Sequence, residues 1–268
     1  MKLLTINTHS IIENDYKRKL DVFINAINEI KPDIITMQEV NQTSTEDAIM
    51  HNDARIFNDG TIPIKRDNHA YCVQKGLEKF GCYYNLAWLG FKNGYKKFDE
   101  GLSVMSLAPI EKIHSFTISK TSEYNDWQTR KVLGIYAFGE WFYSVHMGWW
   151  RGENEPFICQ WERLNANIKK EQRVWLMGDF NNSEHKRGEG YDKIISDGWI
   201  DTYKIAKDKD TGYTAHTKID GWQEKCEMPL RIDYIFTNKT IDIQSSFVVF
   251  DGKNREKISY HNAILVNL

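Results

Sequence analysis

The stretch from Val174 to Asn181 reads VWLMGDFN and joins an apolar run to a polar end. The apolar part is short, which is typical of a buried β-strand. Asp179 and Asn181 follow it at once, so a carboxylate and a carboxamide stand at the end of a rigid element. In open α/β sheets, ligands collect at such strand ends. The stretch therefore predicts a central strand and one part of a polar site.

Other apolar runs in the chain end in, or contain, the same kinds of polar residue. Together they supply carboxylates, imidazoles and carboxamides at the predicted edge of a sheet. Such a set suits a hard cation that is bound by oxygen atoms, with imidazole groups to handle protons. The residues are Asn7, Glu39, His146, Asp233 and His261.

Each of these residues also has an ordinary structural explanation. An asparagine at a strand end commonly forms a turn, and Glu39 could cap a helix or loop. A lone histidine, such as His146 or His261, is more often a satisfied core residue than a catalyst. Asp233 differs because a buried carboxylate needs a partner, and Arg231, a histidine or a metal ion could supply it. The ordered set, rather than any one member, indicates a catalytic site.

Composition narrows the class of protein. The 268 residues show no linker or repeat, and we predict one domain over residues 1–268. The formal net charge is −2, whereas proteins that grip long nucleic acids usually carry a basic excess. Four scattered cysteines argue against a zinc cluster and favour reduced thiols. Without a secretory leader or a long apolar run, we expect a cytoplasmic protein with no membrane contact and no obligate protein partner.

Short apolar runs alternate with helical patterns, which predicts a mixed α/β protein with stacked sheets. The segment from Leu20 to Ile30 has helical spacing and stops before Pro32. Further predicted helices span 155–169 and 191–196. The predicted strands span 2–7, 33–39, 101–107, 131–138, 141–146, 173–178, 231–236 and 259–266.

Six blocks of the sequence resemble the exonuclease–endonuclease–phosphatase (deoxyribonuclease I-like) superfamily and follow its order. The most specific are GDFN at 178–181 and RIDYIF at 231–236. The resemblance implies a four-layer α/β/β/α sandwich with two central mixed β-sheets, and a metal-dependent phosphoester hydrolase. The other blocks are Asn7, MQEV at 37–40, SVH at 144–146 and SYH at 259–261.

The resemblance also implies roles for individual residues. Glu39 would be the main ligand of Mg²⁺, with Mn²⁺ as the alternative ion, and Asn7 would lie beside it. Asp179 and Asn181 would position the attacking water and the phosphoryl oxygens. His261 would act as the general base, oriented by Asp233. His146 would donate a hydrogen bond to the phosphoryl group, with Glu100 as the partner of His146.

One position departs from the superfamily's pattern. The last block usually reads Ser-Asp-His, and in this chain Tyr260 replaces the aspartate. That aspartate often helps to hold the metal or its waters. We therefore expect a change in metal coordination, with less effect on the role of His261.

Loops beside the predicted site indicate the substrate. Trp149 and Trp150 follow His146 closely, and Trp222 lies in a later loop. Tryptophans at the mouth of a polar site suit sugar rings, although a place in the core or stacking on bases are alternatives. These loops most resemble bacterial maltose-6′-phosphate phosphatases, which implies hydrolysis of maltose 6′-phosphate to maltose and phosphate. Arg130 is a candidate for binding the phosphate dianion, with a surface salt bridge as the alternative.

Two other functions compete with a sugar-phosphate phosphatase. A metal-dependent endo- or exonuclease similar to exonuclease III would use the same mechanism. Near-neutral charge and the lack of a Lys/Arg-rich duplex-binding segment favour a small phosphorylated sugar over nucleic acid. A catalytically silent binding protein on the same fold is the third hypothesis, and only Tyr260 supports it.

Overall fold

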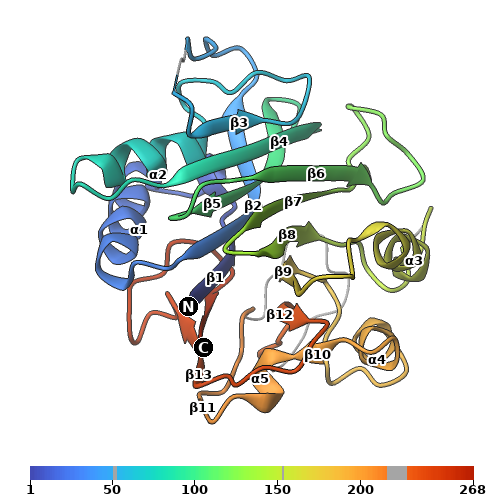
Figure 1. Ribbon diagram of the computed structural model, residues 1–268. Coiled ribbons are helices and arrows are strands. Elements are labelled where there is room, and N and C mark those ends of the chain that lie inside the picture. Colours follow the sequence, from blue (N-terminus) through green and yellow to red (C-terminus); the bar gives the residue numbers. More distant parts are fainter. Residues whose placement is uncertain (51–52, 153, 216–227) are drawn as a thin grey trace.

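The computed structural model describes residues 1–50, 53–152, 154–215 and 228–268. Two β-sheets lie face to face near the centre of the molecule, and helices flank them (Figure 1). One pair of helices, α1 (Tyr16–Ile30) and α2 (His69–Glu78), comes from the first third of the chain. The other pair, α3 (Phe157–Asn167) and α4 (Gly190–Ser196), follows later. Two short helices, η1 (Ser10–Ile12) and α5 (Thr202–Ile205), complete the helical elements of the described residues.

The larger sheet has eight strands: β1 (Lys2–Asn7), β2 (Ile34–Thr43), β3 (Ile56–Asn58), β4 (Asn85–Gly94), β5 (Phe98–Ser106), β11 (Asp208–Lys209), β13 (Ser245–Val249) and β14 (Ala263–Asn267). Their order across the sheet is β11-β13-β14-β1-β2-β5-β4-β3. β1 and β2 are parallel, with Asn7 beside Gln38, while β14 and β5 run antiparallel on either side. The sheet is therefore mixed, and it brings the end of β1 beside the middle of β2, next to Glu39; β2 extends past the predicted end at Glu39 to Thr43.

The smaller sheet has six strands: β6 (Lys112–Thr117), β7 (Lys131–Ala137), β8 (Glu140–His146), β9 (Val174–Asp179), β10 (Ile200–Asp201) and β12 (Asp233–Thr237). Their order is β10-β12-β9-β8-β7-β6. The parallel pair β8 and β9 places His146 beside Asp179. The antiparallel pair β9 and β12 places Asp233 on the other side of Asp179. Strand register alone thus brings three predicted site residues into one row.

Alternation of side chains along β1 separates two of the hydrophobic cores. Leu4 and Ile6 join the core that α1 and α2 close, where Phe23 is fully buried. Leu3 faces the other way and joins the core between the sheets, which includes Met177 of β9. A third core packs Trp161 of α3 and its neighbours on the outer side of the smaller sheet. Successive strand residues point to opposite faces, so these cores define four layers, and the predicted α/β/β/α sandwich is confirmed.

Several element boundaries differ from the sequence prediction. Six of the described strands were not predicted, namely β3, β4, β6, β10, β11 and β13. β3, β10 and β11 are only two or three residues long, and β6 is an edge strand with exposed or half-buried side chains. The strand predicted for 259–266 begins only at Ala263, because Ser259 and His261 turn aside to make side-chain hydrogen bonds.

The structure bears on two expectations from composition, membrane contact and the state of the cysteines. Within the described ranges, no helix is long and apolar enough to cross a membrane. Cys72, Cys82 and Cys159 are free cysteines, as their spacing predicted, and Cys226 lies outside the described residues. The cytoplasmic location and the single domain stay predictions.

Candidate active site

Gly178 allows the polar end of β9 to form. Its φ is +148°, and a Cβ at this position would lie 2.0 Å from the carbonyl oxygen of Val145 on β8. Only glycine leaves space for so close an approach of two backbones. Beyond the strand, Asn181 takes a left-handed conformation with φ +50° and donates its backbone N–H to Asp179 Oδ1 at 2.9 Å. The GDFN segment therefore holds the Asp179 carboxylate against the loop that follows it.

A β-bulge in β2 sets the direction of the Glu39 side chain. The pairing of β2 with β5 shifts register between Met37 and Val40, and Glu39 has φ +50°. A bulge of this kind redirects one side chain out of the strand's alternation. The strained turn is held by the carbonyl of Glu39, which accepts hydrogen bonds from Ser10 Oγ at 2.8 Å and Asn41 Nδ2 at 2.9 Å.

Asn7 joins the two sheets at the site. Its Nδ2 donates to Glu39 Oε1 at 2.8 Å and to Asp179 Oδ2 at 3.1 Å. The Tyr260 hydroxyl donates to the same Glu39 Oε1 at 3.1 Å. Carboxylates from the larger and the smaller sheet thus converge on one amide, and the Tyr260 side chain lies beside the Glu39 carboxylate.

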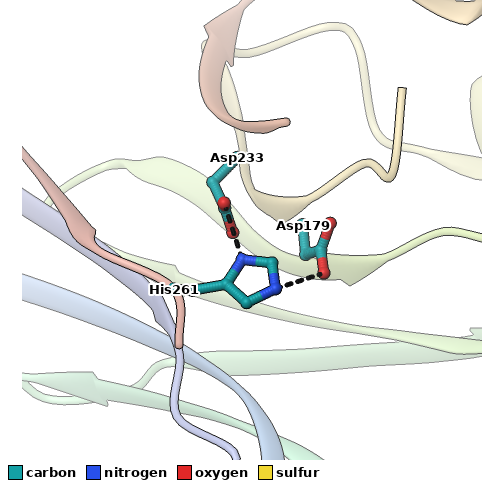
Figure 2. Close-up of side chains that lie close together, drawn as sticks. All are labelled: Asp179, Asp233 and His261. Carbon is teal, nitrogen blue, oxygen red and sulfur yellow. Dashed lines mark hydrogen bonds and ion pairs between the residues drawn. The ribbon is translucent and has the colours of Figure 1, made fainter. Parts of the chain in front are cut away.

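Asp233, His261 and Asp179 form a buried row (Figure 2). Asp233 Oδ2 lies 2.8 Å from His261 Nδ1, and His261 Nε2 lies 3.7 Å from Asp179 Oδ2. Of the three possible partners for the buried Asp233 carboxylate, His261 and not Arg231 forms the contact. Arg231 pairs instead with Asp201, at 2.7 Å, and with Glu184.

The surroundings shift the pKa values of the two histidines of the site in opposite directions. Burial, together with the charges of Arg130 and Lys92, holds the pKa of His146 well below its usual range. Burial also lowers the pKa of His261, but the carboxylates of Asp233 and Asp179 outweigh it and raise that pKa to about 9. Histidines with pKa values pushed apart suit different roles, one as a neutral hydrogen-bond donor and one as a group that gains and loses a proton.

The carboxylates of this site fit a divalent cation. One ligand atom from each of Asp179, Asp233 and His261 lies within 4.8 Å of the others, so this group could hold an ion. A cation there would displace the hydrogen bond between Asp233 and His261. Glu39 and Asp179 offer a second place, where both carboxylates now accept hydrogen bonds from Asn7 Nδ2 and a cation would replace that N–H donor. Burial and the nearby Asp233 charge raise the pKa of Asp179 despite the opposing charge of His261, and a bound cation would relieve that repulsion.

Arg130 and Lys92 place two buried cations next to these residues. Arg130 is 6% exposed and Lys92 is 6% exposed. Arg130 forms no ion pair with any carboxylate in the described part of the chain, and its Nε has no hydrogen-bond partner there. The alternative of a surface salt bridge for Arg130 is therefore wrong.

Glu100 has a different partner from the predicted one. Its Oε1 lies 2.8 Å from Lys92 Nζ, and both side chains are buried. No hydrogen bond or ion pair between Glu100 and His146 is found among the residues that the structure describes. The pairing with His146 was implied by the superfamily resemblance, and the prediction overlooked the buried Lys92.

The predicted tryptophans have separate surroundings. Trp149 contacts Trp127, with ring centroids 5.7 Å apart and planes inclined at 47°. Trp150 lies against Phe157 in the core under α3, which matches the core alternative, and its substrate role stays a prediction. Trp222 lies outside the described residues.

Sequence reasoning missed Lys92 and Trp127 as members of this site. Lys92 follows the apolar run from Leu86 to Phe91, so the same pattern that found Asp179 could have found it. Trp127 lies in a loop without any periodic pattern, and its closeness to Trp149 arises only from the fold.

Comparisons with known proteins agree with this architecture. Residues 4–261 match the model of the endonuclease/exonuclease/phosphatase family. A family protein from Leptotrichia buccalis C-1013-b is 31% identical, with a TM-score of 0.87 over 100% of this chain and 98% of that one. A mannosyl-6-phosphatase from Bacteroides thetaiotaomicron VPI-5482 is 17% identical, with a TM-score of 0.66 over 100% and 98%. Truncated TDP2 from Caenorhabditis elegans is also 17% identical, with a TM-score of 0.61 over 99% and 95%.

The fold and the buried acidic site define a phosphoester hydrolase that depends on a divalent metal. With a family match over nearly its whole length, the chain belongs to the endonuclease/exonuclease/phosphatase family. A comparison with curated proteins gave no match. The two neighbours at 17% identity support the fold alone.

Proposed function

We propose that the protein is a Mg²⁺-dependent phosphomonoesterase that removes phosphate from a phosphorylated sugar. The observation that carries the proposal is Arg130, a buried guanidinium with an unpartnered Nε and no carboxylate partner in the described residues. Burial lowers the pKa of Arg130 although the charges of nearby carboxylates, first Glu100 and Glu39, oppose it. A phosphate dianion would supply two oxygens directly to this guanidinium. Lys92, which pairs with Glu100, adds a second buried cation.

Each catalytic side chain has a task in this proposal. Asp233 holds the Nδ1–H of His261, so that Nε2 faces the site and takes a proton from the attacking water. Asp179 and Asn181 position that water and the phosphoryl oxygens. His146, kept neutral by its surroundings, donates a hydrogen bond to a phosphoryl oxygen.

Glu39 and Asn7 would hold the metal ion next to Asp179. Asn7 would bind it through Oδ1, which requires the amide to turn, because Nδ2 now faces both carboxylates. When bound, the ion supplies positive charge that stabilises the developing charge on the phosphoryl oxygens and lowers the pKa of His261 toward neutrality. Carboxylate and carboxamide oxygens are ligands that Mg²⁺ prefers, and Mn²⁺ is the alternative ion.

The sugar part of the proposal depends on the loops around the site. Trp149 follows His146, the last residue of β8, after two intervening residues, and its ring contacts that of Trp127. Aromatic rings suit the apolar C–H face of a sugar, while polar groups bind its rim. Maltose 6′-phosphate is the specific substrate that we propose, on the basis of the sequence resemblance of these loops.

A substrate panel tests the proposal. Purified protein is incubated with Mg²⁺ or Mn²⁺, and with EDTA as the control, and released phosphate is measured. The panel contains maltose 6′-phosphate, other sugar phosphates, bis(p-nitrophenyl) phosphate, and supercoiled and linear DNA. We expect metal-dependent release of phosphate from the sugar esters, with the diester and both DNAs intact. Cleavage of DNA or of the diester with inert sugar phosphates would show a nuclease instead.

A further inference from the structure

Two loops beside the site are linked to each other. The first, residues 118–130, joins β6 to β7, and the second, residues 147–156, joins β8 to α3. Asn154 Nδ2 donates to Gln128 Oε1 at 2.6 Å, and the backbone N–H of Lys120 donates to Glu155 Oε2 at 2.7 Å. These contacts hold the described parts of the two loops together as one wall.

Trp127 is fixed on this wall by the two buried cations. Its carbonyl oxygen accepts hydrogen bonds from Arg130 Nη1 at 2.7 Å and from Lys92 Nζ at 3.3 Å. The residue nevertheless stays 52% exposed, and its indole ring contacts Trp149 on the second loop. The Nε1 of Trp149 is buried without a hydrogen-bond partner in the described residues. An exposed ring is thus anchored through its backbone to the groups proposed to bind phosphate.

We infer that Trp127, with Trp149, binds the sugar ring of the substrate and determines specificity for phosphomonoesters of pyranoses. The inference rests on the proposed function and adds a residue that selects the alcohol rather than the phosphate. An indole face suits the apolar C–H face of a pyranose, and the unpartnered Nε1 of Trp149 can donate to a sugar hydroxyl. Because Arg130 holds the Trp127 carbonyl, the phosphate and the ring are recognised by one connected unit.

The test compares phosphomonoesters that differ in the alcohol. Glucose 6-phosphate and maltose 6′-phosphate carry a pyranose, whereas glycerol phosphate carries none. For Trp127→Ala we expect the ratio of kcat/KM for the sugar esters to that for glycerol phosphate to fall roughly tenfold. Trp127→Phe keeps an aromatic ring and should retain most of the ratio. Phe80→Ala is the matched control, because Phe80 is also 52% exposed but follows α2.

Inhibition by products gives a second measurement. Trp127→Ala should weaken inhibition by free maltose about tenfold while changing inhibition by inorganic phosphate far less. Should Trp127→Ala not fold, Trp127→Gln removes the aromatic ring and keeps part of the bulk of the side chain, and it repeats both measurements.

The outcomes separate the inference from the proposed function. Wild-type protein that releases no phosphate from any sugar ester overturns both. Wild-type activity on sugar esters with an unchanged ratio in Trp127→Ala, or with an equal loss on all substrates, overturns the inference alone.

Discussion

At the scale of single residues, His261 depends on Asp233 for its orientation and on both Asp233 and Asp179 for its charge. The residue is 1% exposed, and its buried Nε2 has no hydrogen-bond partner among the described residues, so a water bound within the site would satisfy it. A neutral alanine would remove the proposed base without removing the carboxylates around it.

We therefore expect His261→Ala to lower kcat by at least about 10²-fold, since general bases commonly contribute that much. Steady-state kinetics on the preferred sugar ester measure the change. His114→Ala is the matched control, because His114 lies on β6, where its Nδ1 is 3.0 Å from the Tyr143 hydroxyl. A loss of only a few-fold in His261→Ala would remove His261 from the role of base.

Tyr260 tests the departure from the superfamily's pattern. Tyr260→Asp would place a second carboxylate beside Glu39, where the Tyr260 hydroxyl now donates a hydrogen bond at 3.1 Å. We expect the Kd for Mg²⁺ to fall by about tenfold or more, because in a partly buried site the attraction between one added carboxylate and the ion should strengthen binding at least by that factor. Isothermal titration calorimetry without substrate measures it, with Tyr260→Phe as the uncharged control. An unchanged Kd would indicate that another residue supplies the missing charge.

Polar residues that end apolar runs were predictable, and their partners were not. Asn7, Glu39 and Asp179 stand out because each ends an apolar run. The pairing of Glu100 with Lys92, and of Arg231 with Asp201, depends on contacts that the fold creates. Such contacts leave no local pattern in the sequence.

At the scale of the elements, the approach of β9 to β8 depends on Gly178. A Cβ there would meet the Val145 carbonyl, and relief would require the two parallel strands to separate. Gly139, in the turn between β7 and β8, also has a positive φ of +76° but has open space around a Cβ.

Gly178→Ala should therefore cost at least about 2 kcal/mol of unfolding free energy, or prevent folding, because the clash adds to the backbone strain. Gly139→Ala should cost about 1–2 kcal/mol through strain alone. Urea denaturation measures both variants. Equal costs would mean that the close approach of the strands is not what requires glycine.

Central strands were predicted better than edge strands. The runs of β1, β8 and β9 are apolar because both of their faces are covered. β6 is an edge strand whose side chains are only partly covered, so it lacks that signal. Position in the sheet explains the difference for these strands, whereas β4 is an inner strand that was not predicted.

At the scale of the whole molecule, the site exists only where the two sheets meet. Gln38 of β2 donates to Ser144 Oγ of β8 at 3.0 Å, and Asn7 of β1 donates to Asp179 of β9 at 3.1 Å. The ends of the strands could be predicted from the sequence, and the superfamily resemblance implied the sandwich. The distances between sheets follow from how their inner side chains pack, which no single segment determines.

Arg231 joins the loop after β9 to the start of β12 and so supports the same region. Its side chain is 1% exposed, its guanidinium lies 4.6 Å from the ring centres of Tyr203 and Tyr234, and its Nε donates to Glu184 at 3.1 Å. Burial raises the pKa of Glu184, but hydrogen bonds and charge from Arg231 and Lys204 outweigh it and lower that pKa to about 2.

A folded-state pKa below the ordinary value of 4.5 means that ionised Glu184 stabilises the fold above pH 4.5 and that this contribution is lost as the pH falls toward 2. Glu184→Gln should therefore be less stable than the wild type at pH 7, by about 1–2 kcal/mol, and the gap should close between pH 4.5 and 2. Thermal unfolding across this pH range measures the gap. Glu256→Gln is the control, because Glu256 pairs with Arg18 at the exposed surface and should change little at any pH. A gap that stays constant from about pH 7 to about pH 3 would mean that Glu184 does not stabilise the fold through its charge.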